Sequence, residues 1–446
     1  MATTHPFARR LNATCIAGLL SLTSGSALAA GFALIEQSVS SMGTAYAGAG
    51  SAAEDASYIY FNPASMSRLE GTQVSGGLHV VLPKTEFSGD ASYNPTYLGS
   101  PPPPSGPPIL AGADNNTDAG VTGAVPHFAY VRELNDKMNF GLTINVPFGL
   151  KTEYGNGWVG RYSSTEGEVK TVNLNPTLSF KVDEHVTVGV GLSVMYANLI
   201  YQNIIDGDFP SDTSGTTTND IPSKIDVDDW GFGWNFGALL QPTDSTRLGI
   251  AYRSKIEVEL EGDISAAPAV TGSAKADANL PDSILLSAFH QVNPQWAVMA
   301  DVMWTQWSRI DKLAFRLGNG TTSTIPLKWE DSFRYAIGTS YKKDDRWTLR
   351  GGLAFDESPT PSPEFRISAL PDEDRTWLTI GAGFKYSKNI SLDFGYAHLF
   401  IDDTDINSTD AYSSLAAPLV EGPHLIDGEY EASVDIISAQ VNWKFD

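Results

Sequence analysis

Apolar and polar residues alternate along most of this chain. From about Thr72 to the C-terminus, segment after segment places apolar side chains at every second position, with small or polar side chains between them. In 390–397, Ile390, Leu392, Phe394 and Tyr396 alternate with Ser391, Asp393, Gly395 and Ala397. Because successive side chains of a strand point to opposite faces, this period predicts β-strands with one apolar and one polar face.

One stretch invites a different interpretation, a membrane helix. Residues 185–205 contain no Asp, Glu, Lys or Arg and are long enough to cross a bilayer as a helix. Valine or leucine nevertheless occupies every even position from Val186 to Val194, and threonine, glycine or serine occupies the odd positions between them. A helix has no period of two, so we interpret this stretch as one long strand.

The connections between the predicted strands come in two sizes. Short turns lie at 135–137, 183–184, 241–245, 293–294, 343–345 and 387–389, and long loops lie at 88–124, 151–166, 203–222, 261–276, 311–326, 357–371 and 402–429. Strict alternation of six short and seven long connections requires fourteen strands. Short turns at one end and long loops at the other are typical of outer-membrane barrels, and closure leaves no unpaired edge in lipid. We therefore predict an all-β fold, a 14-stranded antiparallel transmembrane β-barrel, over residues 72–446.

Aromatic residues on the apolar parity support a membrane wall. Many lie near strand ends, where interfacial girdles occur: Trp296, Trp304, Trp347, Phe394, Tyr396, Trp443 and Phe445. The chain also finishes on an aromatic strand, which is typical of bacterial barrels. A secreted array of soluble β-sandwiches is the alternative, and the alternation of short and long connections disfavours it.

The first 29 residues predict a cleavable signal peptide. Arg9 and Arg10 form a basic start, residues 15–22 a moderately apolar core, and Ala27-Leu28-Ala29 an A-x-A cleavage site. Cleavage after Ala29 removes Cys15, the single cysteine, so the mature chain has no disulfide or thiol chemistry. Cys15 lies inside the apolar run, ahead of the cleavage site, and this position argues against a lipoprotein.

Residues 30–71 are rich in small side chains and precede the first predicted strand. The run 43–53 consists almost entirely of Gly, Ala, Ser and Thr, which cannot build a core of their own. Asn62 is a good helix N-cap, Pro63 suits the first helical position, and Gly71 is expected to end this short helix. We predict that this segment forms a small helical hatch that plugs the barrel.

The predicted barrel has an intermediate width and a defect in its third strand. Fourteen strands lie between the roughly 8-stranded barrels that side chains fill and the open porins of about 16–18 strands. With residues 30–71 inside, the barrel passes a bound ligand rather than bulk solute. Pro147 cannot donate a ladder hydrogen bond, and Gly149 permits a bulge or bend. Pro147, Phe148 and Gly149 therefore mark either a side opening in the wall or the end of the strand.

Charge and motifs exclude several functions. The chain has 446 residues and a formal net charge of −23, and so acidic a protein repels nucleic acid. Its histidines form no H-E-x-x-H zinc motif and accompany no G-x-S-x-G nucleophile elbow, so we expect no enzyme activity, cofactor or metal. Residues 403–407 begin like a calcium loop, but Ser408 replaces the required glycine, and we interpret them as a solvated acidic loop.

A set of motifs runs in order along nearly the whole mature chain: Ala30-Gly31-Phe32, 43–48, Asn62-Pro63-Ala64, 147–153, 230–235, 252–254, 293–297, 354–359 and 370–378. Together they resemble the long-chain fatty-acid transporter (FadL) and aromatic hydrocarbon transporter family of outer-membrane proteins. The resemblance implies a fourteen-stranded barrel with an N-terminal hatch that takes up hydrophobic compounds. It implies that ligand lodges among the outer loops, moves to a tighter internal site, and leaves sideways at the kinked third strand after the hatch rearranges.

The resemblance also assigns residue roles. Phe32 matches the family's N-terminal aromatic near the internal ligand, Gly149 the kink, Asn62-Pro63-Ala64 the hatch motif, and Lys328 a lysine near the ligand head group.

Strand parity places further cations on the inner face: Arg253, Arg334, Arg350 and Lys385. Such a cation either binds a carboxylate ligand or joins a structural ladder with Asp301, Glu330 or Asp356.

Two departures from the family pattern concern the substrate. Residues 201–203 lack a cation where the family has a second head-group arginine, and the loop 203–222 is shorter and more polar. We expect a passive transporter of hydrophobic compounds, first of all long-chain fatty acids; an aromatic hydrocarbon transporter and a general porin are the alternatives. We expect a monomer surrounded by outer-membrane lipid and lipopolysaccharide.

Overall fold

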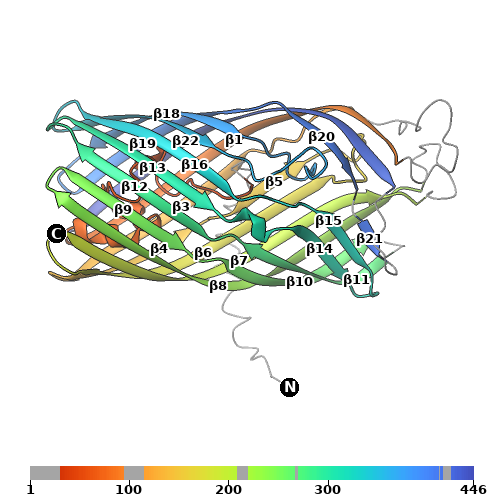
Figure 1. Cartoon of the computed structure of the whole chain (residues 1–446), viewed down its shortest axis with the longest axis horizontal. Helices are drawn as coiled ribbons and strands as arrows, with labels where there is room; N and C mark the ends of the chain where they lie inside the picture. The colour runs from red at the N-terminus through yellow and green to blue at the C-terminus, as the bar shows by residue number, and fades with distance from the viewer. Residues whose placement is uncertain are drawn as a thin grey trace, which may run out of the picture.

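The strands of this chain close into a barrel (Figure 1). The computed structural model describes residues 31–94, 115–207, 219–266, 270–410, 412–414 and 423–445. Strand β1 (Thr72–Tyr93) pairs along its whole length with β22 (His424–Phe445), so the first strand joins the last. Within these residues the sheet is a closed antiparallel barrel of fourteen strands, which confirms the predicted fold class. The predicted signal peptide lies outside the described residues.

The remaining strands follow the order of the chain, and several barrel strands are interrupted and carry two labels. The strands are β2 (Asn116–Asp118), β3 (Gly123–Asn135), β4 (Met138–Asn145), β5 (Gly149–Glu153), β6 (Glu166–Lys181), β7 (Val186–Ile205), β8 (Ile221–Thr243), β9 (Thr246–Arg253), β10 (Ile256–Ala266), β11 (Val270–Leu280), β12 (Ser283–Gln291), β13 (Trp296–Thr305), β14 (Lys312–Leu317), β15 (Thr322–Pro326), β16 (Ser332–Lys342), β17 (Trp347–Asp356), β18 (Arg375–Lys385), β19 (Ile390–Ile401), β20 (Thr404–Thr409) and β21 (Tyr412–Ser414).

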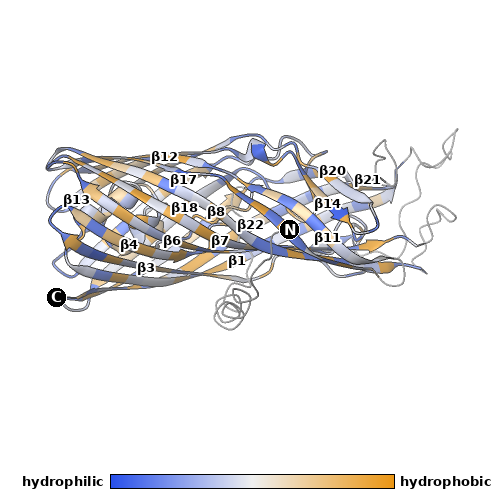
Figure 2. Ribbon diagram, turned by 90° about the horizontal axis from the view of Figure 1, so that it is seen from below, coloured by the Kyte–Doolittle hydropathy of each residue, from blue (hydrophilic) through white to orange (hydrophobic). Residues whose placement is uncertain are grey.

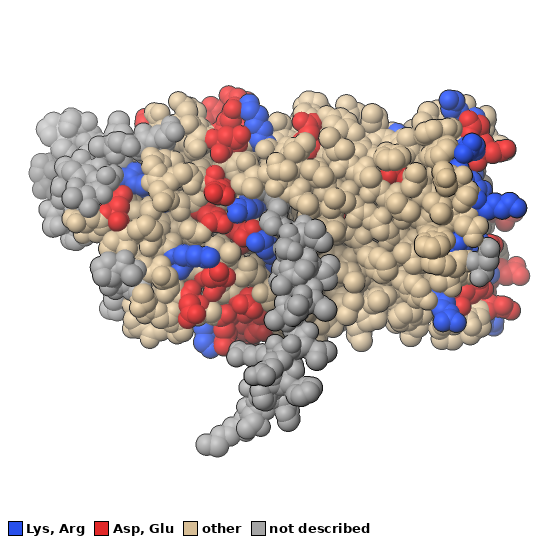
Figure 3. Space-filling view, turned by 180° about the vertical axis from the view of Figure 1, so that it is seen from behind, with Lys and Arg blue, Asp and Glu red and all other residues tan. Residues whose placement is uncertain are grey.

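Large apolar side chains cover the outer wall. Phe232 is 71% exposed, Leu192 64% and Ile380 60%, and along β19 Phe394 points outward while Asp393 is buried inside. Figure 2 shows the resulting alternation of hydrophobic and hydrophilic residues along the strands. Figure 3 shows a broad, mostly uncharged zone on the wall between charged residues near the two ends. The wall in this zone therefore suits a hydrocarbon environment.

The stretch 185–205 is strand β7, as its period of two predicts. No helix among the described residues combines the length and the apolar character that a membrane-spanning helix requires.

Several predicted loops are wrong, because they form strands instead. The predicted loops 261–276 and 311–326 belong mostly to the hairpins β10–β11 and β14–β15, and part of the predicted acidic loop at 403–407 is strand β20. Along β10, Val258 and Leu260 point inward while Glu259 is exposed, so apolar and polar faces have exchanged places relative to the membrane zone. An outward charged face does not look like a membrane strand in sequence, and this is why the prediction failed.

Residues 31–71, the lumen segment, run inside the barrel (Figure 1). They contain a short α-helix, α3 (Val39–Met42), and two 3₁₀ helices, η1 (Ala56–Tyr60) and η2 (Pro63–Arg68); a further short turn, η4 (Trp307–Arg309), follows β13. The fit is close: a Cβ atom at Gly352 of the wall would lie 2.2 Å from the carbonyl carbon of Thr44. Small residues on both sides are therefore a packing requirement.

The helix predicted after Asn62 begins where expected and ends earlier. The Asn62 side chain accepts a hydrogen bond from the Ala64 amide, and its Nδ2 donates to the carbonyl oxygens of Gly50 and Ala238. Asn62 thus caps η2 and also ties the lumen segment to β8. The helix ends at Arg68, and Gly71, with φ +69°, turns the chain into β1 instead of ending the helix.

Buried polar contacts hold the lumen segment to the wall. Asp301 on β13 accepts hydrogen bonds from the amides of Gly48 (2.7 Å) and Ala49 (3.0 Å), and Ser287 donates to the same carboxylate. A carboxylate that pairs backbone N–H groups inside a protein is a strong tether.

Replacing Asp301 with alanine is expected to loosen the lumen segment without unfolding the barrel. The change leaves two buried amides unpaired, at about 1–3 kcal/mol each. In planar bilayers we expect Asp301→Ala to show larger and more frequent ion-conducting openings than the wild type. Asp435→Ala, which removes an exposed carboxylate from the outer wall, is the matched control. Equal conductance of Asp301→Ala and the wild type would contradict the tether.

Candidate functional site

The wall is interrupted in its third strand. Strand β6 pairs first with β4 and then with β5, whereas β3, which pairs with β1 on its other side, pairs with β4 but not with β5 in the described part of the barrel. Residues 146–148 separate β4 from β5, so the break coincides with Pro147. Contact across the gap resumes at a single bridge between Gly120 and Thr152. The backbone of β5 therefore faces a gap where a neighbouring strand is missing.

The start of the lumen segment fills this gap from inside. Leu34 donates its amide to the carbonyl oxygen of Pro147 (2.8 Å), and Gly149 donates its amide to the carbonyl oxygen of Phe32 (2.9 Å). Ala33 and Phe148 lie opposite each other between these bonds as an isolated antiparallel bridge. The lumen segment thus supplies the backbone partners that the broken strand lacks.

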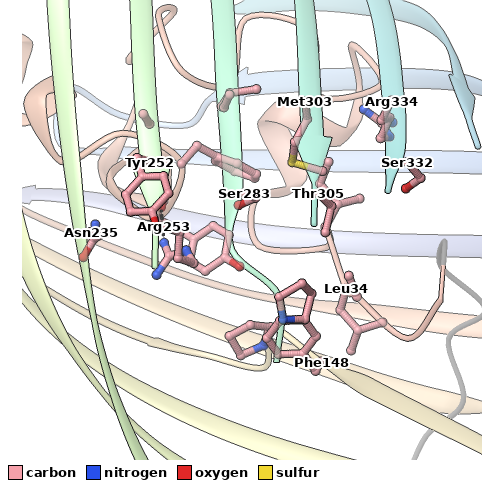
Figure 4. A pocket seen from close by; sticks show the side chains of 18 of the residues that line it. Leu34, Phe148, Asn235, Tyr252, Arg253, Ser283, Met303, Thr305, Ser332 and Arg334 are labelled. Atoms are coloured by element: carbon pink, nitrogen blue, oxygen red, sulfur yellow. Dashed lines mark hydrogen bonds between the residues drawn. The ribbon is translucent and has the colours of Figure 1, made fainter. Parts of the chain in front are cut away.

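Two largely apolar cavities lie next to this closure. The kink cavity is lined by Leu34, Pro147, Phe148, Asn235, Arg253, Trp307 and Arg334, among others, and the outer cavity by Phe32, Leu199, Tyr201, Leu260, Lys312 and Trp329, among others. Each encloses about 950 Å³ of empty space, open mouth included. Figure 4 shows the kink cavity, with Leu34 and Phe148 beside each other. Concave apolar sites with a few polar groups are typical of small-molecule binding.

Four aromatic rings separate the two cavities. Phe148 and Trp307 line the kink cavity, and Phe32 and Trp329 line the outer cavity. The ring of Phe32 lies 5.1 Å from that of Trp307, 5.7 Å from that of Phe148 and 5.8 Å from that of Trp329, measured between centroids. Trp307 and Trp329 meet edge to face at 5.2 Å. We call these four residues the aromatic partition, and Phe32, which contacts the other three rings, is its centre.

A buried carboxylate holds the residue before Phe32. Gly31 donates its amide to Asp372 Oδ2 (2.9 Å), which also accepts a hydrogen bond from Ser358, while Arg375 pairs with Oδ1. Burial in the loop between β17 and β18 raises the pKa of Asp372 to about 6, although Arg375 lowers it. A Cβ atom at Gly31 would lie 2.7 Å from the Trp307 ring, and its φ of +61° also favours glycine. Gly31 thus lets Trp307 pack directly on the chain.

The predicted cations occupy different places. Arg253 and Arg334 line the kink cavity, and Arg334 lies 3.9 Å from Asp356. Arg350 lines neither cavity: it pairs with Glu54 of the lumen segment (2.6 Å) and with Asp393 (2.8 Å). The ammonium group of exposed Lys328 lies 4.3 Å from the Phe365 ring, in a groove outside both cavities. Lys385 lies with Arg350.

The sequence pattern did not single out several residues of the site. Trp307 and Trp329 lie between strands, where no period indicates direction, and Asn235 looked only like part of a motif. Lys312 lines both the outer cavity and the groove that holds Lys328, and it joins no ion pair among the described residues. Lys312 is the first residue of the short strand β14, and the sequence pattern did not indicate that it lines a cavity.

Removing the Trp307 ring is expected to release the start of the lumen segment. Trp307→Ala takes away the contacts with Gly31, Phe32 and Phe148, a loss of about 3–5 kcal/mol for a buried aromatic ring. Hydrogen exchange of the Leu34 and Gly149 amides, which close the gap, should become faster than in the wild type. Trp158→Ala is the matched control, because Trp158 is equally buried but packs in a separate cluster near Phe87 and Tyr430. If both variants change these two amides alike, Trp307 has no special place in the closure.

Comparison with known proteins places this chain among transporters. Residues 20–445 match the family model described as outer membrane protein transport protein (OMPP1/FadL/TodX). Outer membrane protein P1 of Haemophilus influenzae is 33% identical over 88% of this chain and 90% of its own length. The long-chain fatty acid transport protein of Escherichia coli K12 is 29% identical over 94% and 96%.

Solved structures show the same fold. A Pseudomonas aeruginosa FadL homologue superposes with a TM-score of 0.82 at 24% identity, over 94% of this chain and 100% of that one. The toluene transporter TodX of Pseudomonas putida has a TM-score of 0.64 at 16% identity, over 95% and 100%. The relatives are transport proteins and not enzymes. The chain therefore belongs to the OMPP1/FadL/TodX family, outer-membrane β-barrels that transport hydrophobic compounds.

Proposed function

We propose that this barrel passively takes up long-chain fatty acids and releases them sideways through its wall. The acid binds first in the outer cavity, passes the aromatic partition into the kink cavity, and leaves at the gap beside β5. The lumen segment acts as the hatch, tethered by Asn62, Asp301 and Arg350. The family resemblance of Phe32 and of the Asn62-Pro63-Ala64 motif supports these roles.

One observation carries the proposal: the same three residues close both barriers. Phe32 is the centre of the aromatic partition, and the Phe32 carbonyl and the Leu34 amide close the gap in the wall. A displacement of Phe32, Ala33 and Leu34 therefore opens the passage between the cavities and the exit together. A ligand that pushes Phe32 aside gains both openings with one movement.

The energies permit such a displacement without an external source. Leaving the two buried amides of the gap unpaired costs about 1–3 kcal/mol each, and the aromatic contacts add about 0.5–1.5 kcal/mol each. Each methylene moved from water into an apolar cavity contributes about 0.8 kcal/mol. An acyl chain of ten or more methylenes thus offsets the opening, whereas a small polar solute does not. The barrel in this scheme is gated by its ligand.

Aromatic hydrocarbon uptake is the second candidate. The fold is shared with a toluene transporter, and the predicted outer loop is more polar than in fatty-acid transporters. The partition of aromatic rings would bind a planar hydrocarbon as readily as an acyl chain. A general porin is disfavoured, since the lumen segment fills the interior of the barrel. We expect the barrel to be a monomer surrounded by outer-membrane lipid and lipopolysaccharide.

A reversible cross-link tests the exit. Ala33 and Phe148 form a non-hydrogen-bonded antiparallel pair, which brings Cα atoms to about 4.5 Å and suits a disulfide. The double variant Ala33→Cys with Phe148→Cys is expected to lose uptake of radiolabelled oleate when oxidised and to regain it with reductant. The assay uses cells that lack their own transporter, with toluene as the second substrate.

Comparing the oxidised and reduced states of one variant removes the effect of losing the Phe148 ring. The single variants Ala33→Cys and Phe148→Cys, which form no internal bond, are the controls. Undiminished oleate uptake by the fully cross-linked barrel would exclude the exit beside β5. If the cells take up toluene but not oleate, the substrates are aromatic hydrocarbons and not fatty acids.

A further inference from the structure

Two polar residues lie at one end of the largely apolar kink cavity. Asn235 on β8 and Arg253 on β9 are cross-strand neighbours in register, and both side chains point into the barrel. Figure 4 shows them side by side at one end of the cavity, with Leu34 and Phe148 at another and Arg334 on the far side. Asn235 and Arg253 thus form a polar end of the cavity, away from Arg334, and apolar residues line it beside the wall gap.

The side-chain amide of Asn235 has a fixed orientation, and its Nδ2 donor forms no hydrogen bond. Its Oδ1 accepts a hydrogen bond from Asn175 Nδ2 (2.8 Å), which fixes which way the amide points. Its Nδ2 is buried and has no hydrogen-bond partner, and the residue is only 3% exposed. A buried donor without an acceptor is unfavourable, so its retention points to a partner that arrives with a ligand.

The guanidinium of Arg253 is also held in place by one set of contacts while one of its donors forms no hydrogen bond. Its Nη2 donates to the Tyr60 carbonyl oxygen (2.6 Å), and its guanidinium lies over the Tyr60 ring at 4.3 Å. These two contacts to η1 fix the plane of the guanidinium, yet Nη1 is buried and has no partner. Two neighbouring residues at this end of the cavity therefore each have an unused donor, and one of these donors is cationic.

The charges of the cavity favour an anion. Among the described residues, its lining contains three side chains that carry a charge at neutral pH: Arg253, Arg334 and Asp356. Asp356 lies beside Arg334, at 3.9 Å, whereas Arg253 takes part in no ion pair within the described residues. The positive charge of Arg253 is thus available to a bound anion, and the attraction between opposite charges is stronger in an apolar setting than in water.

We propose that Arg253 Nη1 and Asn235 Nδ2 bind the carboxylate of an amphipathic acid in the kink cavity, with its acyl chain along Phe148 and Pro147 toward the gap. This site rests on the proposed function and makes it specific: the last cavity before the exit selects acids. A hydrocarbon of the same shape leaves both donors unpaired, so it binds there more weakly.

The test compares two ligands that differ only in the carboxylate, oleate and 8-heptadecene. Asn235→Asp keeps the acceptor for Asn175 but replaces the unused donor with a negative charge, which neutralises Arg253 and repels oleate. Arg253→Met removes the charge and keeps an apolar stem. In equilibrium binding of the radiolabelled compounds to the purified barrel, we expect either variant to bind oleate about 10–100-fold more weakly, with 8-heptadecene affected less than about threefold.

Asn139→Asp is the matched control, because Asn139 is a buried, inward asparagine on β4 that lines neither cavity. The Asn235→Asp variant leaves the Arg253–Tyr60 contact in place, so it separates ligand binding from a role of Arg253 in anchoring the lumen segment. Equal changes for the two ligands, or no change for oleate, would overturn the carboxylate site while leaving the transporter proposal standing. If the wild-type barrel binds neither ligand, the transporter proposal fails and the site fails with it.

Discussion

A membrane wall made of strands must pair its backbone groups, and the rest of this molecule depends on how that constraint is met at Pro147. The wall breaks between β4 and β5, and β3 offers no partner beyond the break. The partners come from residues 32–34, which belong to the lumen segment and not to the barrel. The wall is thus closed by residues of the lumen segment, which is not itself a strand of the barrel. Because that segment also carries Phe32, the state of the wall and the state of the internal passage are linked.

The polarity of the wall changes along its height, and this change places the ligand cavities. In the membrane zone, Phe394 faces outward and Asp393 faces the polar surroundings inside. On β10, beyond that zone, Val258 faces inward and Glu259 faces outward. The outer surface there suits water, and the freed apolar side chains line the outer cavity, to which Leu260 belongs. The outer cavity therefore offers an apolar surface inside the barrel, beneath a wall whose outer face on β10 is charged.

The arginines on the inner face show which properties of the site the sequence predicts and which it does not. Strand parity placed Arg253, Arg334 and Arg350 inside, and all three point there. Strand parity does not tell how high along the barrel axis an arginine lies or which carboxylate lies next to it. Arg350 lies between two carboxylates against the lumen segment and Arg334 lies beside one, whereas Arg253 forms no ion pair within the part of the chain that the structure describes. Only the packing of the lumen segment separates an arginine held in ion pairs from one that forms none among the described residues, and a single sequence does not contain that packing.

The sequence by itself determined the closed barrel of fourteen strands, the membership of the family and the position of the weak point in the third strand, because periodicity, turn spacing and proline chemistry are local properties. It misjudged the outer hairpins, where the alternation is inverted. Only the tertiary structure decided that Ala33 bridges Phe148 and that Gly31 binds Asp372. It also assembled the aromatic partition from four separate segments. These contacts join residues far apart in the chain, and they exist only because closing the sheet brings the lumen segment against the inside of its wall.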